Sequence, residues 1–212
     1  MDRVGHLYRN WISGNKIVMI SAQQIKELRE RTGAGVSDVK KALEEAGGDM
    51  EKAEAVIERK FGASALKRAG RVLGAGVVEA YIHSNGRIGS LVELLCETDF
   101  VGRNPEFRAL AHDIALHVAA MRPMYASRDA VPADVRDLQK SRFAEEVASL
   151  EKPAHIKEEI IDGKLNAYFG ALSLLDQPFV KDQDKAVNDM VSEAAGRFGE
   201  NIKVGRFVRF EV

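Results

Sequence analysis

Residues 77–97 read VVEAYIHSNGRIGSLVELLCE. Two runs rich in Val, Ile, Leu and Tyr, residues 77–83 and 88–97, flank the pair Asn85-Gly86. Asn-Gly between two such runs is the strongest short-range signal for a β-hairpin, because a two-residue turn of this kind needs a positive φ at both positions. The stretch therefore predicts two antiparallel strands, around which the rest of the fold can be placed.

The segments that follow this hairpin alternate between helical and extended patterns. Asn104 before Pro105 is typical of a helix start, and apolar residues then recur at helical spacing from Phe107 to Met121. Similar patterns predict further helices over residues 132–150, 153–169 and 184–198. Apolar and charged residues alternate over 202–212, which predicts a final strand. Strands separated by helical runs indicate an α+β domain with a small antiparallel sheet flanked by helices.

On the amino-terminal side, residues 19–61 predict a unit of three short helices. Three residues are suited to cap their starts: Ser21 (with Gln24 completing a capping box), Ser37 and Asp49. Glycines are expected to end the first two helices, at Gly33 and Gly35 and at Gly47-Gly48. About forty residues are enough for a small three-helix core.

The pattern divides the chain into four parts. Residues 1–18 lack the continuous apolar stretch of a signal peptide, and we interpret them as a disordered extension or an upstream start, with Met19 as the functional start. Residues 19–61 form the three-helix domain and 77–212 the α+β core. Between them, 62–76 are a linker, or a helix followed by the hinge Gly74-Ala75-Gly76.

Composition restricts the class of partner. Lys and Arg number 31 against 32 for Asp and Glu, and this balance favours a protein or small-molecule partner over direct nucleic-acid binding. Cys96 is the one cysteine, so neither an intrachain disulfide nor a cysteine-based zinc site is expected, as is typical of a reducing cytoplasm. No apolar run has the length that a membrane-spanning segment requires.

Motifs for catalysis or for cofactor binding are missing from the sequence. There is no phosphate-binding loop of the Gly-x-x-x-x-Gly-Lys-Ser/Thr type and no nucleophile elbow. Gly33-Ala34-Gly35 and Gly74-Ala75-Gly76 lack the third spaced glycine of a dinucleotide loop. His112 and His117 are five residues apart on a predicted helix and point to different faces, which disfavours a shared metal. We therefore expect a protein that is not an enzyme, with no catalytic residue, metal or cofactor.

Two stretches resemble one family. Leu28 to Val36 (LRERTGAGV) and Lys40 to Asp49 (KKALEEAGGD) are similar to the amino-terminal domain of elongation factor Ts, and Glu97 to Val101 (ETDFV), with Asn104 and Phe107, resembles that family's Thr-Asp-Phe-Val motif. Shorter matches follow in the expected order at residues 86–89, 119–123, 177–180, 199–202 and 209–211. Together the matches extend from Met19 to Val212.

The resemblance implies a fold and an activity. The fold would be a three-helix domain like the ubiquitin-associated (UBA) domain, a linker and an α+β core. The activity would be guanine-nucleotide exchange on the GTPase elongation factor Tu, from which GDP is released so that GTP can bind. The chain has one Thr-Asp-Phe-Val region and one hairpin, as in the short members of the family, and these are thought to act as homodimers.

By the same resemblance, ten residues contact elongation factor Tu. Phe100 would wedge between two helices of the GTPase and Asp99 would anchor the contact, which displaces the elements that hold magnesium and the phosphates. The full set comprises Thr98, Asp99, Phe100 and Val101, then Arg29, Val36 and Lys40 from the three-helix domain, and His83, Phe198 and Gly199.

Simpler interpretations compete with these roles. A Phe is usually a core residue, charged side chains such as Arg29 and Lys40 usually only solvate a helix face, and His83 fits an unliganded surface histidine. The whole chain could also be a protein-binding adaptor that uses the UBA-like domain and does not need Asp99 or Phe100. An RNA-associated role would use the basic cluster Lys67, Arg68 and Arg71.

Overall fold

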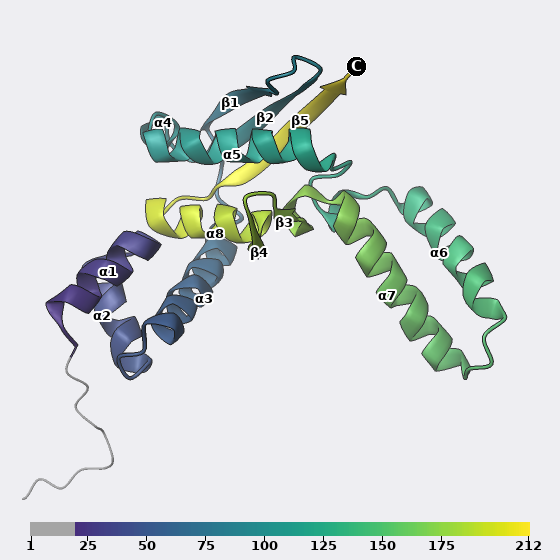
Figure 1. The fold of residues 1–212 in the computed structure, drawn as a ribbon, viewed down its shortest axis with the longest axis horizontal. Coiled ribbons are helices and arrows are strands. Elements are labelled where there is room, and N and C mark those ends of the chain that lie inside the picture. Colours follow the sequence, from purple (N-terminus) through teal and green to yellow (C-terminus); the bar gives the residue numbers. More distant parts are fainter. Residues whose placement is uncertain (1–19) are drawn as a thin grey trace, which may run out of the picture. The chain divides into compact units, whose positions relative to one another are not determined.

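The computed structural model describes residues 20–212, over which the chain forms eight α-helices, two short 3-10 helices and five strands (Figure 1). Helices and an antiparallel sheet occur together, which confirms the predicted α+β class. The extension predicted for residues 1–18 and the start proposed at Met19 lie outside the described residues.

Residues 20–57 form one compact unit of three helices, α1 (Ala22–Thr32), α2 (Val36–Glu45) and the first part of α3 (Met50–Arg68). The capping box at Ser21 is confirmed, because the Gln24 N–H donates to the Ser21 hydroxyl at 3.1 Å and the Ser21 N–H donates to the Gln24 side chain at 3.0 Å. Asp49 caps α3 through the Lys52 N–H at 3.1 Å. The buried core of this unit consists of Leu28, Ala34, Val39, Ala42, Leu43, Ala53 and Ile57.

The start predicted for the second helix at Ser37 is wrong. Gly35 occupies the cap position and α2 already begins at Val36. The Gly35 carbonyl accepts the N–H groups of Asp38 and Val39 at 2.9 and 3.0 Å, so the helical hydrogen bonds begin before Ser37 can serve as a cap.

The third helix extends into the segment that the sequence predicted as a linker, or as a helix followed by a hinge, and its length favours the second alternative. α3 continues past Phe61 to Arg68, so residues 62–68 of the expected linker are helical. The second compact unit, residues 58–212, begins inside this helix at Glu58. The linker boundaries at residues 62 and 76 stay a prediction.

A three-stranded antiparallel sheet forms the centre of the second unit. β1 (Ala75–Ile82) and β2 (Ile88–Cys96) are the predicted hairpin, and β5 (Lys203–Glu211) pairs with the free edge of β2, giving the order β1-β2-β5. The predicted carboxy-terminal strand is therefore confirmed, and it lies beside the hairpin although it is more than a hundred residues away in sequence.

The turn of the hairpin differs from the predicted one. Gly86 has a positive φ of 67°, but Asn85 does not, so the turn is not a two-residue turn with both positions in the left-handed region. The His83 N–H donates to the Ile88 carbonyl and the Gly86 N–H to the His83 carbonyl, both at 2.8 Å, which makes a longer loop over residues 83–87. Asn85 instead accepts the Arg87 N–H through its side chain at 2.9 Å.

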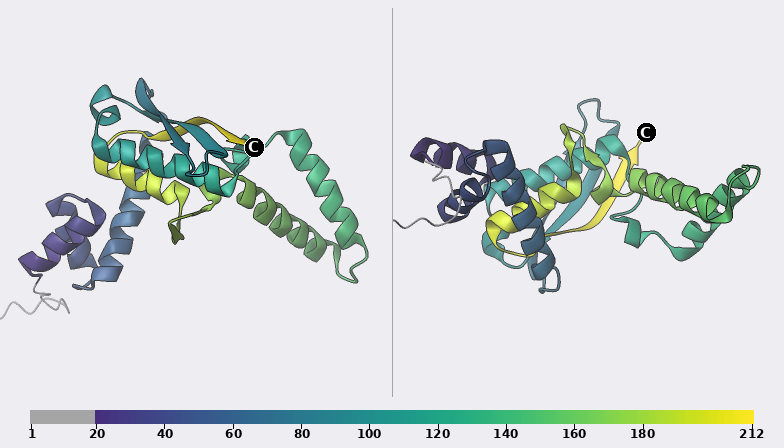
Figure 2. Two further views of the ribbon diagram at one scale, coloured as in Figure 1. Left: turned by 45° about the horizontal axis from the view of Figure 1, so that its top comes forward. Right: turned by 90° about the horizontal axis from the view of Figure 1, so that it is seen from below.

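Helices cover one face of this sheet. α5 (Pro105–Met121) and α8 (Val187–Phe198) lie on the same side of it (Figures 1 and 2). Alternate residues of β2 (Val92, Leu94 and Cys96) are fully buried in the core that these helices complete. The predicted cap at Asn104 is confirmed, since its side chain accepts the Glu106 N–H at 2.8 Å.

Apart from α4 (Asp99–Gly102), which lies between β2 and α5, the remaining elements connect α5 with α8. α6 (Ala133–Ala148) and α7 (Ala154–Leu172) pack side by side as a hairpin of helices (Figure 2). The shorter elements are α4 (Asp99–Gly102), the 3-10 helices η1 (Arg128–Ala130) and η2 (Leu174–Asp176), and the two-stranded sheet of β3 (Pro178–Phe179) and β4 (Asp182–Ala186).

The last helix starts later than its predicted start at residue 184. Residues 184–186 belong to β4, because Ala186 pairs with Pro178 across the small sheet. The Ala186 N–H donates to the Asp189 carboxylate at 3.0 Å, which marks the start of α8 at Val187.

Candidate functional site

Phe100 is a large apolar side chain that the fold leaves in solvent. It lies on α4, directly after β2, and is 92% exposed, which contradicts the alternative of a core phenylalanine. Asp99 is exposed beside it and forms an ion pair with Arg103 at 3.7 Å. Val101 is only 8% exposed and belongs to the core. α4 thus presents Phe100 and Asp99 outward while Val101 points inward.

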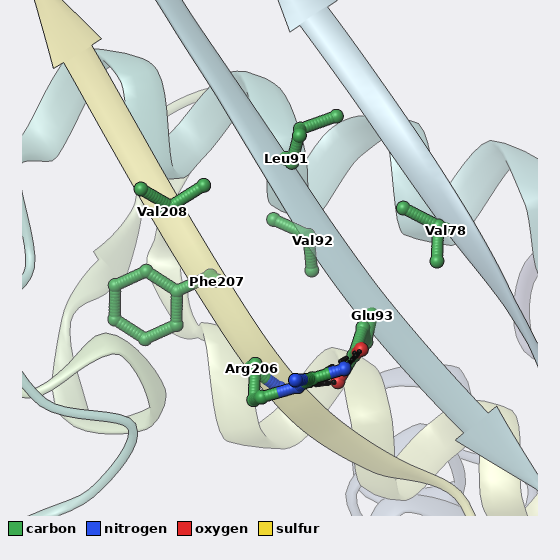
Figure 3. Close-up of a pocket in the computed structure, with 7 residues that line it drawn as sticks. All are labelled: Val78, Leu91, Val92, Glu93, Arg206, Phe207 and Val208. Carbon is green, nitrogen blue, oxygen red and sulfur yellow. Dashed lines mark hydrogen bonds and ion pairs between the residues drawn. The ribbon is translucent and has the colours of Figure 1, made fainter.

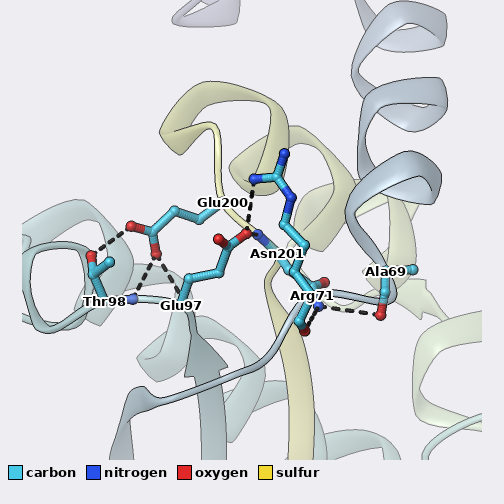
Figure 4. A network of polar contacts seen from close by, with 6 residues as sticks. All are labelled: Ala69, Arg71, Glu97, Thr98, Glu200 and Asn201. Atoms are coloured by element: carbon cyan, nitrogen blue, oxygen red, sulfur yellow. Dashed lines mark hydrogen bonds and ion pairs between the residues drawn. The ribbon is translucent and has the colours of Figure 1, made fainter.

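The Glu200 carboxylate holds the start of α4 (Figure 4). Its Oε2 atom accepts the backbone N–H groups of Glu97 and Thr98, each at 3.0 Å, and its Oε1 atom accepts the Thr98 hydroxyl at 2.5 Å. Hydrogen bonds to an ionised acceptor are the stronger kind, so the turn between β2 and α4 is fixed by three of them.

Glu97 makes the return contact. Its Oε1 atom accepts the Asn201 backbone N–H at 2.6 Å and lies 3.3 Å from the Arg71 guanidinium. The Asn201 side-chain amide donates to the carbonyls of Ala69 and Arg71 at 3.3 and 3.0 Å. Three segments that are far apart in the sequence, residues 69–71, 97–98 and 200–201, are therefore connected (Figure 4).

Phe198 and Gly199 lie at the end of α8 and lead into this network. The Phe198 ring packs edge-on against Phe107, with 6.2 Å between the ring centroids. Gly199 ends the helix in the left-handed region at a φ of 71°, a conformation that favours glycine. Phe198 and Gly199 directly precede Glu200 in the chain, and Glu200 is the residue that is hydrogen-bonded to Thr98.

Cys96 is buried at the end of β2, as predicted for a small apolar residue. Its thiol donates to the Thr98 carbonyl at 3.2 Å. Burial raises the pKa of the Cys96 thiol, and the negative charge of Glu200 raises it further. The side chain is therefore a protonated part of the packing beneath α4.

His83 lies at the opposite end of the hairpin from Thr98. The nine residues of β2 separate the two positions, which corresponds to roughly 30 Å. The Tyr81 hydroxyl and His83 Nδ1 are hydrogen-bonded at 3.1 Å, and the Tyr81 ring packs edge-on against His112. His112 in turn lies 3.1 Å from a carboxylate oxygen of Glu79. His83 is thus part of a separate surface cluster.

Arg29, Val36 and Lys40 belong to the three-helix unit. All three are exposed, and Val36 has 52% of its surface in solvent although it is apolar. Val36 and Lys40 are four residues apart on α2 and share one helix face. Lys40 also lies 3.9 Å from Glu44.

Sequence reasoning missed a second apolar surface. Five large apolar side chains are exposed on the side of the sheet away from α5, and we call this surface the outer sheet face: Val78, Ile82, Leu91, Val208 and Phe210. Leu91 lies opposite Val208, and Gly89 lies between Ile82 and Phe210 in the register. Alternation along β1 and β5 was the signal that could have identified it.

An open hollow lies on this face (Figure 3). Its lining includes Val78, Leu91 and Val208 and an ion pair between Glu93 and Arg206, in which Arg206 Nε lies 3.0 Å from both carboxylate oxygens. The hydrogen bonds from Arg206 lower the pKa of Glu93 to about 2. The pair is therefore charged at neutral pH.

Residues 20–212 contain neither a metal-ligand cluster nor a candidate membrane span. In this part of the chain, no three His, Cys, Asp or Glu side chains are arranged to hold a metal ion. None of its helices has both the length and the apolar character needed to cross a bilayer.

Comparison with known proteins gives a consistent family. The sequence model of the family described as "Elongation factor TS" matches residues 15–212. The elongation factor Ts of Carboxydothermus hydrogenoformans is 49% identical over 194 residues, which cover 92% of this chain and 89% of the relative. That of Thermosipho melanesiensis is 50% identical over 194 residues, covering 92% and 99%, and that of Thermotoga petrophila is 49% identical over 193 residues, covering 91% and 96%. The chain belongs to the elongation factor Ts family, and so to the factors of translation elongation.

Proposed function

We propose that this protein is a guanine-nucleotide exchange factor for the GTPase elongation factor Tu and acts in the cytoplasm. The observation that carries the proposal is Phe100, a 92% exposed aromatic side chain on a short helix whose start is held by Glu200. An exposed, pre-positioned aromatic ring is suited to insertion into a partner. The protein itself makes or breaks no covalent bond in this role.

Phe100 enters between two helices of the GTPase in this mechanism, and Asp99 forms a polar contact beside it. Thr98 and Val101 support the helix from below, since Thr98 is bonded to Glu200 and Val101 is buried. The insertion displaces the elements of the GTPase that hold magnesium and the phosphates, and GDP is released.

One phenylalanine is not sufficient for this effect. Burial of a Phe side chain contributes about 1.5–3 kcal/mol, or one to two decades in an equilibrium constant. By linkage, the factor weakens nucleotide binding by the same free energy by which the nucleotide weakens binding of the factor. A broader contact must therefore favour the nucleotide-free GTPase, and excess GTP then completes the cycle.

The three-helix unit supplies part of this contact in our proposal. Val36 offers an apolar side chain on the surface of α2, with Lys40 one turn away and Arg29 on α1. His83 contributes from its own cluster at the hairpin turn, supported by Tyr81.

We further propose that two copies of the chain form a homodimer through the outer sheet face. Contiguous exposed apolar surface commonly marks an interaction site, and here Leu91 and Val208 are adjacent across two strands. A second copy would bury these side chains against its own equivalent face in a two-fold arrangement. The dimer would then contain two copies of the Thr-Asp-Phe-Val region and of the hairpin, whereas a single chain contains one copy of each.

The test is the release of a fluorescent GDP analogue from purified elongation factor Tu, with magnesium present and unlabelled GDP in excess. The parent protein is compared with Phe100→Ala and with a control, Leu138→Ala, which removes another exposed apolar side chain from α6. Both sites are exposed, so both variants are expected to stay folded.

We expect strong acceleration by the parent and by Leu138→Ala, and a loss of at least about tenfold in Phe100→Ala. Acceleration that Phe100→Ala retains in full would assign exchange to the wider interface. No acceleration by the parent at any concentration would overturn the exchange function and favour a protein-binding adaptor.

A further inference from the structure

Thr98 occupies the position of a helix cap but does not act as one. It precedes α4 with extended backbone angles, and its side chain makes no hydrogen bond to the N–H groups of that helix. Its hydroxyl donates to Glu200 at 2.5 Å instead. The helix that carries Phe100 is thus attached at its start to a residue 102 positions away.

α4 depends on such tertiary contacts. It contains four residues, far fewer than the number at which an isolated helix becomes stable in water. Val101 holds it from the core side and the Glu200 carboxylate from the α8 side. Phe100 itself is almost fully solvent-exposed, so its position is determined by these neighbours.

We propose that Glu200 is a positioning residue for exchange: it fixes the turn at Glu97 and Thr98 so that Phe100 is held ready for insertion into the GTPase. This inference rests on the proposed exchange function. It also assigns Phe198 and Gly199 an indirect role, because the packing of Phe198 and the left-handed backbone of Gly199 direct the chain that carries Glu200.

The inference predicts a specific dependence between two residues. If Glu200 acts through Phe100, its removal weakens exchange only while the Phe100 ring is present. Residues that act as one unit give non-additive effects in a double-mutant cycle, whereas independent contacts give effects that multiply in the rate. A loss of stability alone would not produce this pattern.

The experiment measures GDP release with the parent, Glu200→Ala, Phe100→Ala and the double variant. Glu200→Gln is the conservative variant, because its amide oxygen can still accept the N–H groups of Glu97 and Thr98. Glu159→Gln, on the exposed surface of α7, is the control for loss of a charge. We expect Glu200→Ala to slow release about tenfold, Glu200→Gln less than about threefold, and Glu200→Ala in the Phe100→Ala background less than about twofold.

A second readout does not depend on exchange. Amide hydrogen exchange of the free protein should show protected N–H groups at Glu97 and Thr98 that lose protection in Glu200→Ala, with α5 unchanged. Effects of Glu200→Ala and Phe100→Ala that multiply, or unchanged protection at Thr98, would overturn the positioning role. A parent protein that fails to accelerate release overturns the exchange function, while the amide measurement still reports whether Glu200 anchors the turn.

Discussion

His117 Nε2 lies 2.9 Å from Gln177 Oε1, and both side chains are buried. The Val180 N–H donates to His117 Nδ1 at 3.2 Å, so Nδ1 carries no proton and Nε2 is the donor to Gln177. The Gln177 amide donates to the Ala171 carbonyl at 2.7 Å. A neutral imidazole therefore connects α5 with the end of α7 and with the β3–β4 hairpin.

A fall in pH should protonate His117 and so remove the stability that this connection contributes. Burial lowers the pKa of His117 below its ordinary value of 6.5, so the unfolded chain binds the proton more readily than the folded one. The contribution is fully present above pH 6.5 and is lost as the pH falls toward the lower folded pKa, at up to about 1.4 kcal/mol per pH unit for one group. Urea unfolding of the parent and of His117→Gln between pH 8 and about pH 5 measures it. Equal pH slopes for the two proteins would contradict the prediction.

Replacement of Val36 should affect binding and leave the fold intact. The side chain is 52% exposed on α2, so Val36→Ala is expected to change the free energy of unfolding by less than about 0.5 kcal/mol. Loss of two methyl groups from a contact should weaken binding to nucleotide-free elongation factor Tu by about three- to tenfold. Calorimetric titration measures this affinity. Val72→Ala, at another exposed valine, is the matched control, and an equal loss in both variants would argue against a specific role for Val36.

A charge on the outer sheet face should separate the dimer. Leu91 lies on the central strand beside Val208, and Leu91→Asp would place an unpaired carboxylate between two apolar surfaces. Light scattering at micromolar concentration should give a dimer mass for the parent and a monomer mass for the variant. Leu138→Asp on α6 is the control and should remain dimeric. A monomeric parent would exclude the homodimer, and a dimeric Leu91→Asp would assign its interface to another surface.

Two helical glycines should respond to alanine in opposite ways. A Cβ at Gly196 of α8 would come within 2.4 Å of the Phe61 ring and 2.7 Å of its Cβ atom, so Gly196→Ala is expected to cost about 1–3 kcal/mol. A Cβ at Gly163 of α7 meets nothing within 4 Å, so Gly163→Ala should stabilise by about 0.5–1 kcal/mol through helix propensity. Urea unfolding at pH 7 measures both. A stabilising Gly196→Ala would show that Phe61 moves aside at little cost.

Local patterns in the sequence were sufficient for most elements of secondary structure. The caps at Ser21, Asp49 and Asn104 and the alternation of β5 each depend on residues that are neighbours in the chain. A helix start needs only one side chain and the N–H groups two or three residues later, so short-range signals identify it.

Two predictions failed because backbone hydrogen bonds between segments, which the local patterns do not contain, changed the structure. The pairing of Pro178 with Ala186 converted the expected start of the last helix into β4. The hydrogen bond between the His83 N–H and the Ile88 carbonyl closed a longer loop than Asn85-Gly86 alone indicates. In both cases the pairing of backbone groups determined the structure, and the conformational preference of the individual residues did not.

The sequence by itself determined the α+β class and, through its motifs, the family and the segment that carries Phe100. Only the tertiary structure decided that Phe100 is exposed while Val101 is buried, and that Glu200 holds the turn before them. The physical reason is distance along the chain. Thr98 and Glu200 are 102 residues apart, and they meet because the single core shared by β2, β5, α5 and α8 brings the ends of β2 and α8 together. No periodicity within either segment contains that information.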